Sequence, residues 1–97
     1  MNELRVLVQM LRQMLKDMEI VTSQGSGYYT CTPFAQRYNK LMRQARTLFP
    51  EAAGLMSTFD EIDENDPKDP ADKLKVLLGV RIEVSQLITL LEAAQEK

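Results

Sequence analysis

The sequence predicts an all-α protein, a small up-and-down helical bundle of three long helices plus one short helix. Residues 2–22 and 71–95 both place apolar side chains at alternating spacings of three and four, which puts them on one stripe of an α-helix. Residues 33–49 present a third apolar face, and segments containing glycine or proline separate the three stretches. The one candidate for a short strand, 23–32, has no second strand to pair with, so we expect a loop there.

Composition indicates one globular domain, 1–97. The chain has 97 residues, of which 44% are hydrophobic and 27% are charged, and these values are ordinary for a soluble domain. No stretch approaches the roughly 20 apolar residues of a membrane-spanning helix, and no cleavage site follows the apolar start of the chain. We therefore expect a cytoplasmic protein with no membrane partner. The single cysteine, Cys31, excludes an internal disulfide and agrees with a reducing compartment.

The first predicted helix, 2–22, carries six apolar residues at spacings of 3, 4, 3, 4 and 3. These residues are Leu4, Leu7, Leu11, Met14, Met18 and Val21. Three heptads of this kind suit a short antiparallel bundle as well as coiled-coil-like packing. Met10, Met14 and Met18 also recur every fourth residue, a pattern found both in soft binding surfaces and in ordinary cores, and we favour the core.

The second predicted helix, 33–49, is expected to begin after an N-cap at Thr32, because Pro33 suits the first helical position. Cys31 is expected to be a small side chain beneath the first turn. The apolar face consists of Phe34, Tyr38, Leu41, Ala45 and Leu48. Pro50 ends this helix because it lacks an N–H donor and clashes with the preceding turn.

A separate short helix is predicted at 51–62, where apolar residues resume helical spacing. These residues are Ala52, Leu55, Met56, Phe59 and Ile62. The next segment, 63–70, reads Asp-Glu-Asn-Asp-Pro-Lys-Asp-Pro and predicts a solvated acidic loop. Pro70, or Ala71 after it, then opens the last helix.

The last predicted helix, 71–95, is expected to be the central packing helix. Its main stripe consists of Leu77, Val80, Val84, Leu87, Leu91 and Ala94. Further apolar residues spread around the helix, namely Leu74, Val76, Leu78, Ile82, Ile88 and Leu90. A helix that is apolar on several sides is rarely covered by one neighbour alone.

Missing residue types exclude several kinds of catalysis. The chain has no histidine, which excludes Ser-His-Asp and Cys-His nucleophiles and histidine-based metal sites. The Gly-Ser-Gly segment at 25–27 lacks the spacing of a phosphate-binding loop. The acidic run 60–72 fails the calcium-loop pattern whether it starts at Asp60 or at Asp63, so a solvated loop is favoured over a cation site. We therefore predict a non-enzymatic protein with no cofactor and no metal.

Four cations lie on the second predicted helix with no acid among them. They are Arg37, Lys40, Arg43 and Arg46. The segment 51–72, by contrast, carries eight acids and one lysine. The cations can form a polyanion-binding surface, with Tyr28, Tyr29 or Tyr38 stacking on bases. Alternatively, they cover the solvent side of the helix and pair with the acidic segment that follows, and we favour this interpretation.

The leading functional hypothesis is a helical protein–protein interaction module that self-associates as a dimer through its last helix, or that binds another helical protein. The chain has more apolar surface than one small bundle can bury, and large exposed patches usually mark interfaces. The candidate interface residues are Leu78, Ile82 and Leu90 on the last helix and Met10 and Val6 on the first. The alternative is a small nucleic-acid-binding or ribonucleoprotein accessory subunit that uses the basic helix 33–49.

Overall fold

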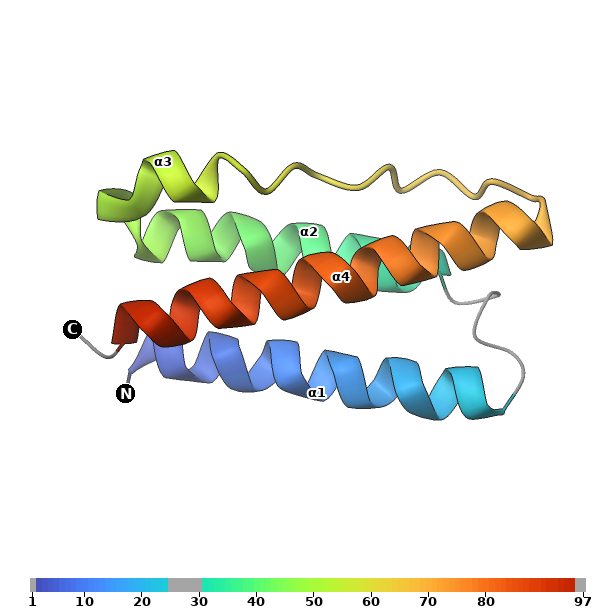
Figure 1. Ribbon diagram of the computed structural model, residues 1–97, viewed down its shortest axis with the longest axis horizontal. Coiled ribbons are helices and arrows are strands. Elements are labelled where there is room, and N and C mark those ends of the chain that lie inside the picture. The colour runs from blue at the N-terminus through green and yellow to red at the C-terminus, as the bar shows by residue number, and fades with distance from the viewer. Residues whose placement is uncertain (1, 25–30, 96–97) are drawn as a thin grey trace.

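The computed structural model describes residues 2–24 and 31–95, and these residues form an all-α bundle without strands (Figure 1). The helices are α1 (Glu3–Ser23), α2 (Cys31–Leu48), α3 (Ala53–Met56) and α4 (Pro70–Gln95). A single 3-10 turn, Pro50–Ala52, leads into α3. Three long helices packed against one another, with one short helix beside them, confirm the predicted fold class.

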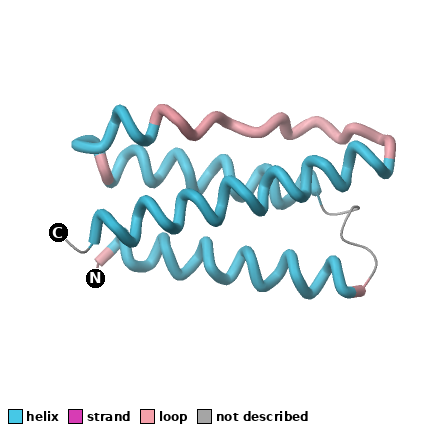
Figure 2. The backbone as a smooth tube through the Cα atoms, viewed as in Figure 1, coloured by secondary structure: helices cyan, strands magenta, loops and turns pink. Residues whose placement is uncertain are grey.

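The long helices are connected so that α2 and α4 run in the same direction, while α1 runs opposite to both (Figure 1). This arrangement arises because the chain between α3 and α4, residues 57–69, is extended and returns along the length of α2 (Figure 2). An extended chain covers about 3.3 Å per residue, against about 1.5 Å for a helix. A short segment therefore suffices to span the elongated molecule, which measures 42 × 23 × 17 Å.

The core lies between the three long helices. α1 contributes Leu7, Val8, Leu11, Met14 and Met18. α2 contributes Cys31, Ala35, Tyr38, Leu41, Met42 and Ala45. α4 contributes Leu77, Val80, Val84, Leu87, Ile88 and Leu91. The stripes predicted on the first and last helices are therefore buried, except at the helix ends, where Leu4, Val21 and Ala94 are half-buried.

The helix predicted over 51–62 is wrong beyond Met56, where α3 ends. The hydroxyl groups of Ser57 and Thr58 each donate a hydrogen bond of 2.7 Å to a carbonyl group of the preceding turn. Such local side-chain bonds to the backbone compete with continuation of a helix. From Ser57 onward the chain is therefore turn and extended backbone.

Two apolar residues predicted on the face of this short helix still reach the core from the extended chain. Phe59 is buried, and Ile62 packs against the core while half-buried. Leu55, predicted on the same face, is 59% exposed. The apolar spacing thus identified core residues but misjudged the backbone that carries them.

α2 begins at Cys31, two residues before the predicted first helical position. Thr32 therefore lies inside the first turn, and its prediction as the N-cap is wrong. Pro33 is tolerated there because the N–H groups of a first turn have no partner inside the helix.

Tyr28 and Tyr29, two of the three tyrosines predicted to stack on bases, lie outside the described residues.

The acidic loop predicted at 63–70 forms most of the second half of the extended segment, and its aspartates shape the local backbone. Asp63, Asp66 and Asp69 accept hydrogen bonds of 2.8–3.0 Å from the N–H groups of Asn65, Lys68 and Ala71, respectively. The bond from Lys68, together with the ammonium group of Lys73 at 3.3 Å, lowers the pKa of the Asp66 carboxyl group. These aspartates therefore fix turns and begin α4.

Candidate interaction surfaces

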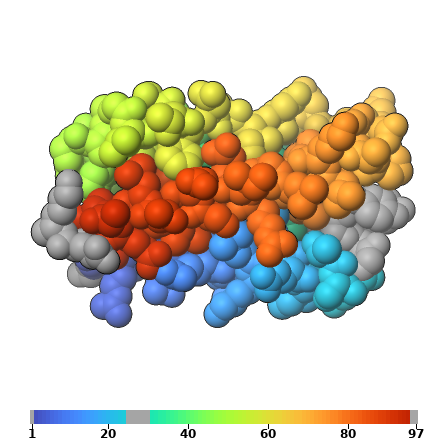
Figure 3. All heavy atoms as spheres, in the orientation of Figure 1, coloured from blue at the N-terminus to red at the C-terminus, as the bar shows by residue number. Residues whose placement is uncertain are grey.

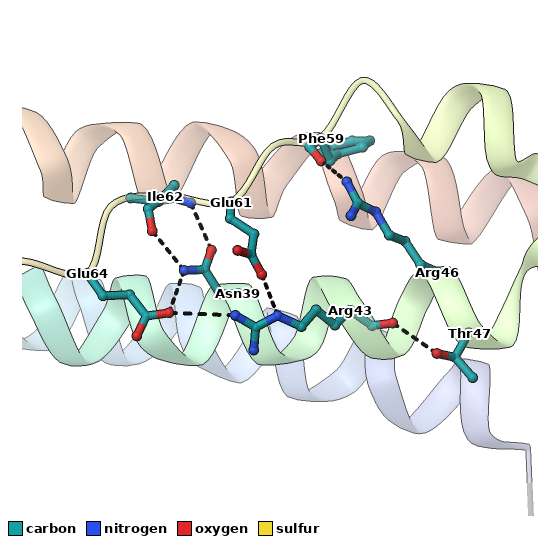
Figure 4. A network of polar contacts seen from close by, with 8 residues as sticks. All are labelled: Asn39, Arg43, Arg46, Thr47, Phe59, Glu61, Ile62 and Glu64. Atoms are coloured by element: carbon teal, nitrogen blue, oxygen red, sulfur yellow. Dashed lines mark hydrogen bonds and ion pairs between the residues drawn. The ribbon is translucent and has the colours of Figure 1, made fainter.

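α2 has α4 on one flank and α1 on the other. The extended segment lies along the flank shared with α4, and we call the place that it occupies the α2/α4 groove (Figures 1 and 4). Phe59, only 7% exposed, and the half-buried Ile62 anchor the segment in the core. The groove on the flank shared with α1, which we call the α1/α2 groove, has no segment of the described chain lying in it.

Asn39 fixes the extended segment onto α2 through a side chain that is almost completely buried. Its Nδ2 donates a hydrogen bond of 2.8 Å to the carbonyl of Ile62, and its Oδ1 accepts one of 2.9 Å from the N–H of the same residue. Nδ2 also donates to Oε2 of Glu64 at 2.8 Å (Figure 4). The amide therefore satisfies an extended backbone that has no neighbouring strand. The sequence analysis missed Asn39 because its partners lie more than 20 residues further along the chain.

Arg43 and Arg46 also hold the extended segment. Arg43 forms ion pairs with Glu61 and Glu64, the latter at 3.8 Å, and Arg46 donates a hydrogen bond to the carbonyl of Phe59 (Figure 4). These contacts agree with the interpretation that the helix cations pair with the acidic segment after them. The arginine and glutamate side chains of the ion pairs are 40–50% exposed, so each pair contributes roughly 0.2–1 kcal/mol.

Tyr38 belongs to the core on this side of α2. Its side chain is fully buried, and its hydroxyl group has no hydrogen-bond partner among the described residues. Burial, with the nearby Glu83 carboxylate as a second cause, raises the pKa of Tyr38 above its usual value. The phenol is therefore neutral at physiological pH. A stacking role would require an exposed ring, which Tyr38 does not offer.

The α1/α2 groove is an open hollow of about 550 Å³ with an apolar floor. The floor is formed by Val6, Leu7, Met10, Leu41 and Leu48. It continues into a second hollow of about 370 Å³, which shares Met10, Arg37 and Leu41 with the first. Val6 and Met10 are 40% and 42% exposed, so they add accessible apolar surface to the floor of this groove.

The α2 side of this groove carries Arg37 and Lys40, and neither forms an ion pair with any residue of the described chain. The α1 side carries the acids Glu3 and Asp17 at its two ends. The structure thus divides the four predicted polyanion-binding residues. Arg37 and Lys40 line the α1/α2 groove, while Arg43, at the edge of that groove, and Arg46 contact the extended segment.

The outer face of α4 is the third candidate surface. Figure 3 shows α4 crossing one face of the molecule, with α1 on one side and the extended segment on the other. Leu74, Leu78 and Ile82 follow one another at steps of four residues and are 48%, 50% and 61% exposed. These three residues form what we call the α4 row.

The predicted interface residues do not all share this face. Leu78 and Ile82 belong to the α4 row, whereas Met10 lines the α1/α2 groove. Leu90 is half-buried and lines a separate hollow beside α3 together with Leu55. Leu74 extends the row and was not among the predicted interface residues.

Ion pairs join α1 to α4 along the edge of the outer face. Arg12 pairs with Glu92, and Arg81 lies 3.6 Å from Glu19. All four side chains are at least 44% exposed, so their contribution to stability is small. The second pair nevertheless neutralises Arg81, which precedes Ile82 in the chain.

No family model, no curated protein and no solved structure matches this chain. Within residues 2–24 and 31–95, no group of three or more acidic or cysteine side chains is arranged to hold a metal ion. In the same part of the chain, no helix combines the length and the apolar character that crossing a membrane requires.

Proposed function

We propose that the protein is a non-enzymatic helical interaction module that self-associates through the outer face of α4. The observation that carries the proposal is the exposure of Leu74, Leu78 and Ile82, each of which is about half exposed or more. Isolated exposed apolar side chains are normal, but a contiguous row along one helix usually marks an interface.

The charge pattern of α4 supports this assignment. The exposed positions between residues 76 and 91 are Leu78, Arg81, Ile82, Ser85, Gln86 and Thr89. Arg81 is the single charged residue in this set, and Glu19 neutralises it. Lys75, next to Leu74, is also exposed and forms no ion pair with the described residues. A second copy can pack over Leu78 and Ile82 while the ammonium group of Lys75 stays in water at the edge of the contact, which avoids the main cost of burying a surface helix, the burial of an unpaired charge.

Gly79 provides a second reason to expect a close partner. It lies inside α4, where a glycine costs about 1 kcal/mol relative to alanine. Apart from its two chain neighbours and the nearby backbone of α4 itself, a Cβ atom added at Gly79 would meet no atom within 4 Å, so packing against the rest of the chain does not require glycine at this position. The absence of a side chain at Gly79 would let a second helix approach α4 closely beside Leu78. A symmetric dimer brings the same face of each copy together.

The test is the solution mass of the wild-type protein and of Ile82→Lys, measured by light scattering on a sizing column. We expect the wild type to have twice the chain mass of 11.1 kDa and Ile82→Lys to be a monomer, because a buried lysine in the interface would lose its hydration. The matched control is Leu55→Lys, which places the same charge at an equally exposed apolar position outside the α4 row. A wild-type monomer, or a dimer that persists in Ile82→Lys, would contradict the proposal.

Nucleic-acid binding through α2 is the second candidate function. Arg37 and Lys40 favour it, since both are exposed and neither is paired within the described chain. Two facts weigh against it: Arg43 and Arg46 are engaged by the extended segment, and Tyr38 is buried. Two available cations form a small electrostatic footprint for a phosphate backbone.

A further inference from the structure

We infer that the α1/α2 groove binds an amphipathic helix from a partner protein, with acidic residues along the edge of that helix that faces α2. This surface lies apart from the α4 row, so the inference does not depend on self-association. The occupant is defined by its chemistry: an apolar stripe for the groove floor and carboxylates for Arg37 and Lys40.

The dimensions of the groove suit a helix. Its lining residues on α1 run from Glu3 to Asp17, which corresponds to about 21 Å along the axis. A docked helix of about four turns has the same length, and it would present apolar residues at spacings of three and four. In this position it would become the fourth long element of the bundle and would cover Val6 and Met10.

The opposite flank of α2 shows how this helix recognises a segment. In the α2/α4 groove, apolar anchors enter the core while Glu61 and Glu64 of the same segment pair with Arg43. In the α1/α2 groove, the same helix offers an apolar floor beside Arg37 and Lys40, and both cations lack a carboxylate partner in the described chain. Charge complementarity therefore favours an acidic occupant on this side too.

The backbone chemistry favours a helix over an extended peptide. The extended segment is held by Asn39, whose amide satisfies the N–H and the carbonyl of Ile62. Among the residues that the structure describes, Asn39 is the only buried amide, and it belongs to the other groove. A helix satisfies its own backbone groups, so it can occupy the α1/α2 groove without such a residue.

Two described surfaces of a second copy match the groove poorly. Along residues 70–91 of α4, Asp72 is the single exposed acid, so the α4 row offers no line of carboxylates for Arg37 and Lys40. The acidic segment 57–69 has the right chemistry but already lies along α2 of its own chain. The charge pattern therefore points to a different protein as the source of the helix.

The experiment uses a display library of single helices selected on the full-length protein. Four leucines are fixed at spacings of four, three and four, and the flanking positions are randomised. Selected helices are then made as fluorescein-labelled peptides, and their dissociation constants are measured by fluorescence anisotropy. We expect Asp and Glu to be enriched along one edge of the selected helices. The double variant Arg37→Glu/Lys40→Glu should bind these helices at least about tenfold more weakly than the wild type does.

Matched variants separate the possible outcomes. Lys16→Glu makes the same type of change on the exposed side of α1, and it should bind as the wild type does. Peptides with lysine in place of glutamate should prefer the double variant over the wild type. Selection without an acidic bias, or equal binding by the double variant and the wild type, would overturn the inference.

Two further outcomes would assign the groove to a different occupant, and each would also overturn the inference. One is loss of the wild-type dimer in the double variant, which would identify a second copy. The other is competition by a single-stranded oligonucleotide at low salt, which would identify nucleic acid. Ile82→Lys should retain peptide binding, so failure of the groove and failure of self-association are distinguishable.

Discussion

The two flanks of α2 carry similar side chains, but the described chain covers only one of them. Both combine apolar side chains with basic residues of the same helix. On the α4 side, the chain's own segment 57–69 covers the helix, and Phe59 is only 7% exposed. On the α1 side the floor stays open, and Met10 is 42% exposed. The flanks therefore differ in the presence of a tethered acidic segment, since α2 presents cations to both.

The largest expected effect comes from the anchor of the covered flank. Phe59→Ala should destabilise the protein by about 3 kcal/mol, because it removes a buried aromatic side chain from the core. Urea denaturation followed by circular dichroism measures the change. Leu55→Ala is the matched control, since Leu55 is 59% exposed and should change stability by about 0.5 kcal/mol or less. Equal effects of the two substitutions would mean that the segment does not belong to the core.

The next largest effect is expected at Asn39, whose side-chain amide bonds the extended backbone as a neighbouring strand would. Asn39→Ala should cost about 2 kcal/mol, because the N–H and carbonyl groups of Ile62 lose their partners on α2. Hydrogen exchange should also accelerate at the Ile62 amide while the amides in the middle of α1 remain protected. Gln36→Ala, an exposed amide on the same helix, serves as the control. A loss no larger than that of the control would show that the segment is held without Asn39.

The smallest effect compares the cations of the two flanks directly. Arg43→Gln should destabilise the protein by roughly 0.2–1 kcal/mol, because Arg43 pairs with Glu61 and Glu64. Arg37→Gln should leave stability unchanged, because Arg37 has no partner within the described chain. The difference should disappear near 1 M salt, where screening acts over about 3 Å. An equal loss for both variants would remove the distinction between a paired and an unpaired flank.

The long helices could be predicted because their signals are local. The apolar stripes of α1 and α4 repeat with the period of a helix, and Pro50 and Pro70 mark boundaries that any backbone must respect. The four cations of α2 could also be found from their spacing. Their partners could not, because an ion pair such as Arg43 with Glu61 depends on where a distant segment lies.

Ser57 and Thr58 end α3 through local hydrogen bonds, but the path of the chain along α2 from Phe59 onward was decided by tertiary structure. Phe59 and Ile62 are three residues apart, a spacing compatible with one face of a helix and equally with anchors along an extended chain. The hydrogen bonds between Asn39 and Ile62, which join residues 23 positions apart, select the extended form.

The sequence by itself therefore determined which helices form and which of their faces are apolar, because these properties repeat within a few residues. Tertiary structure decided which of these faces the chain covers. The long connection between α3 and α4 lies along one flank of α2, and the residues of the α1/α2 groove floor and of the α4 row remain exposed elsewhere on the molecule. That choice is a property of the path of the chain through space, and no local pattern records it.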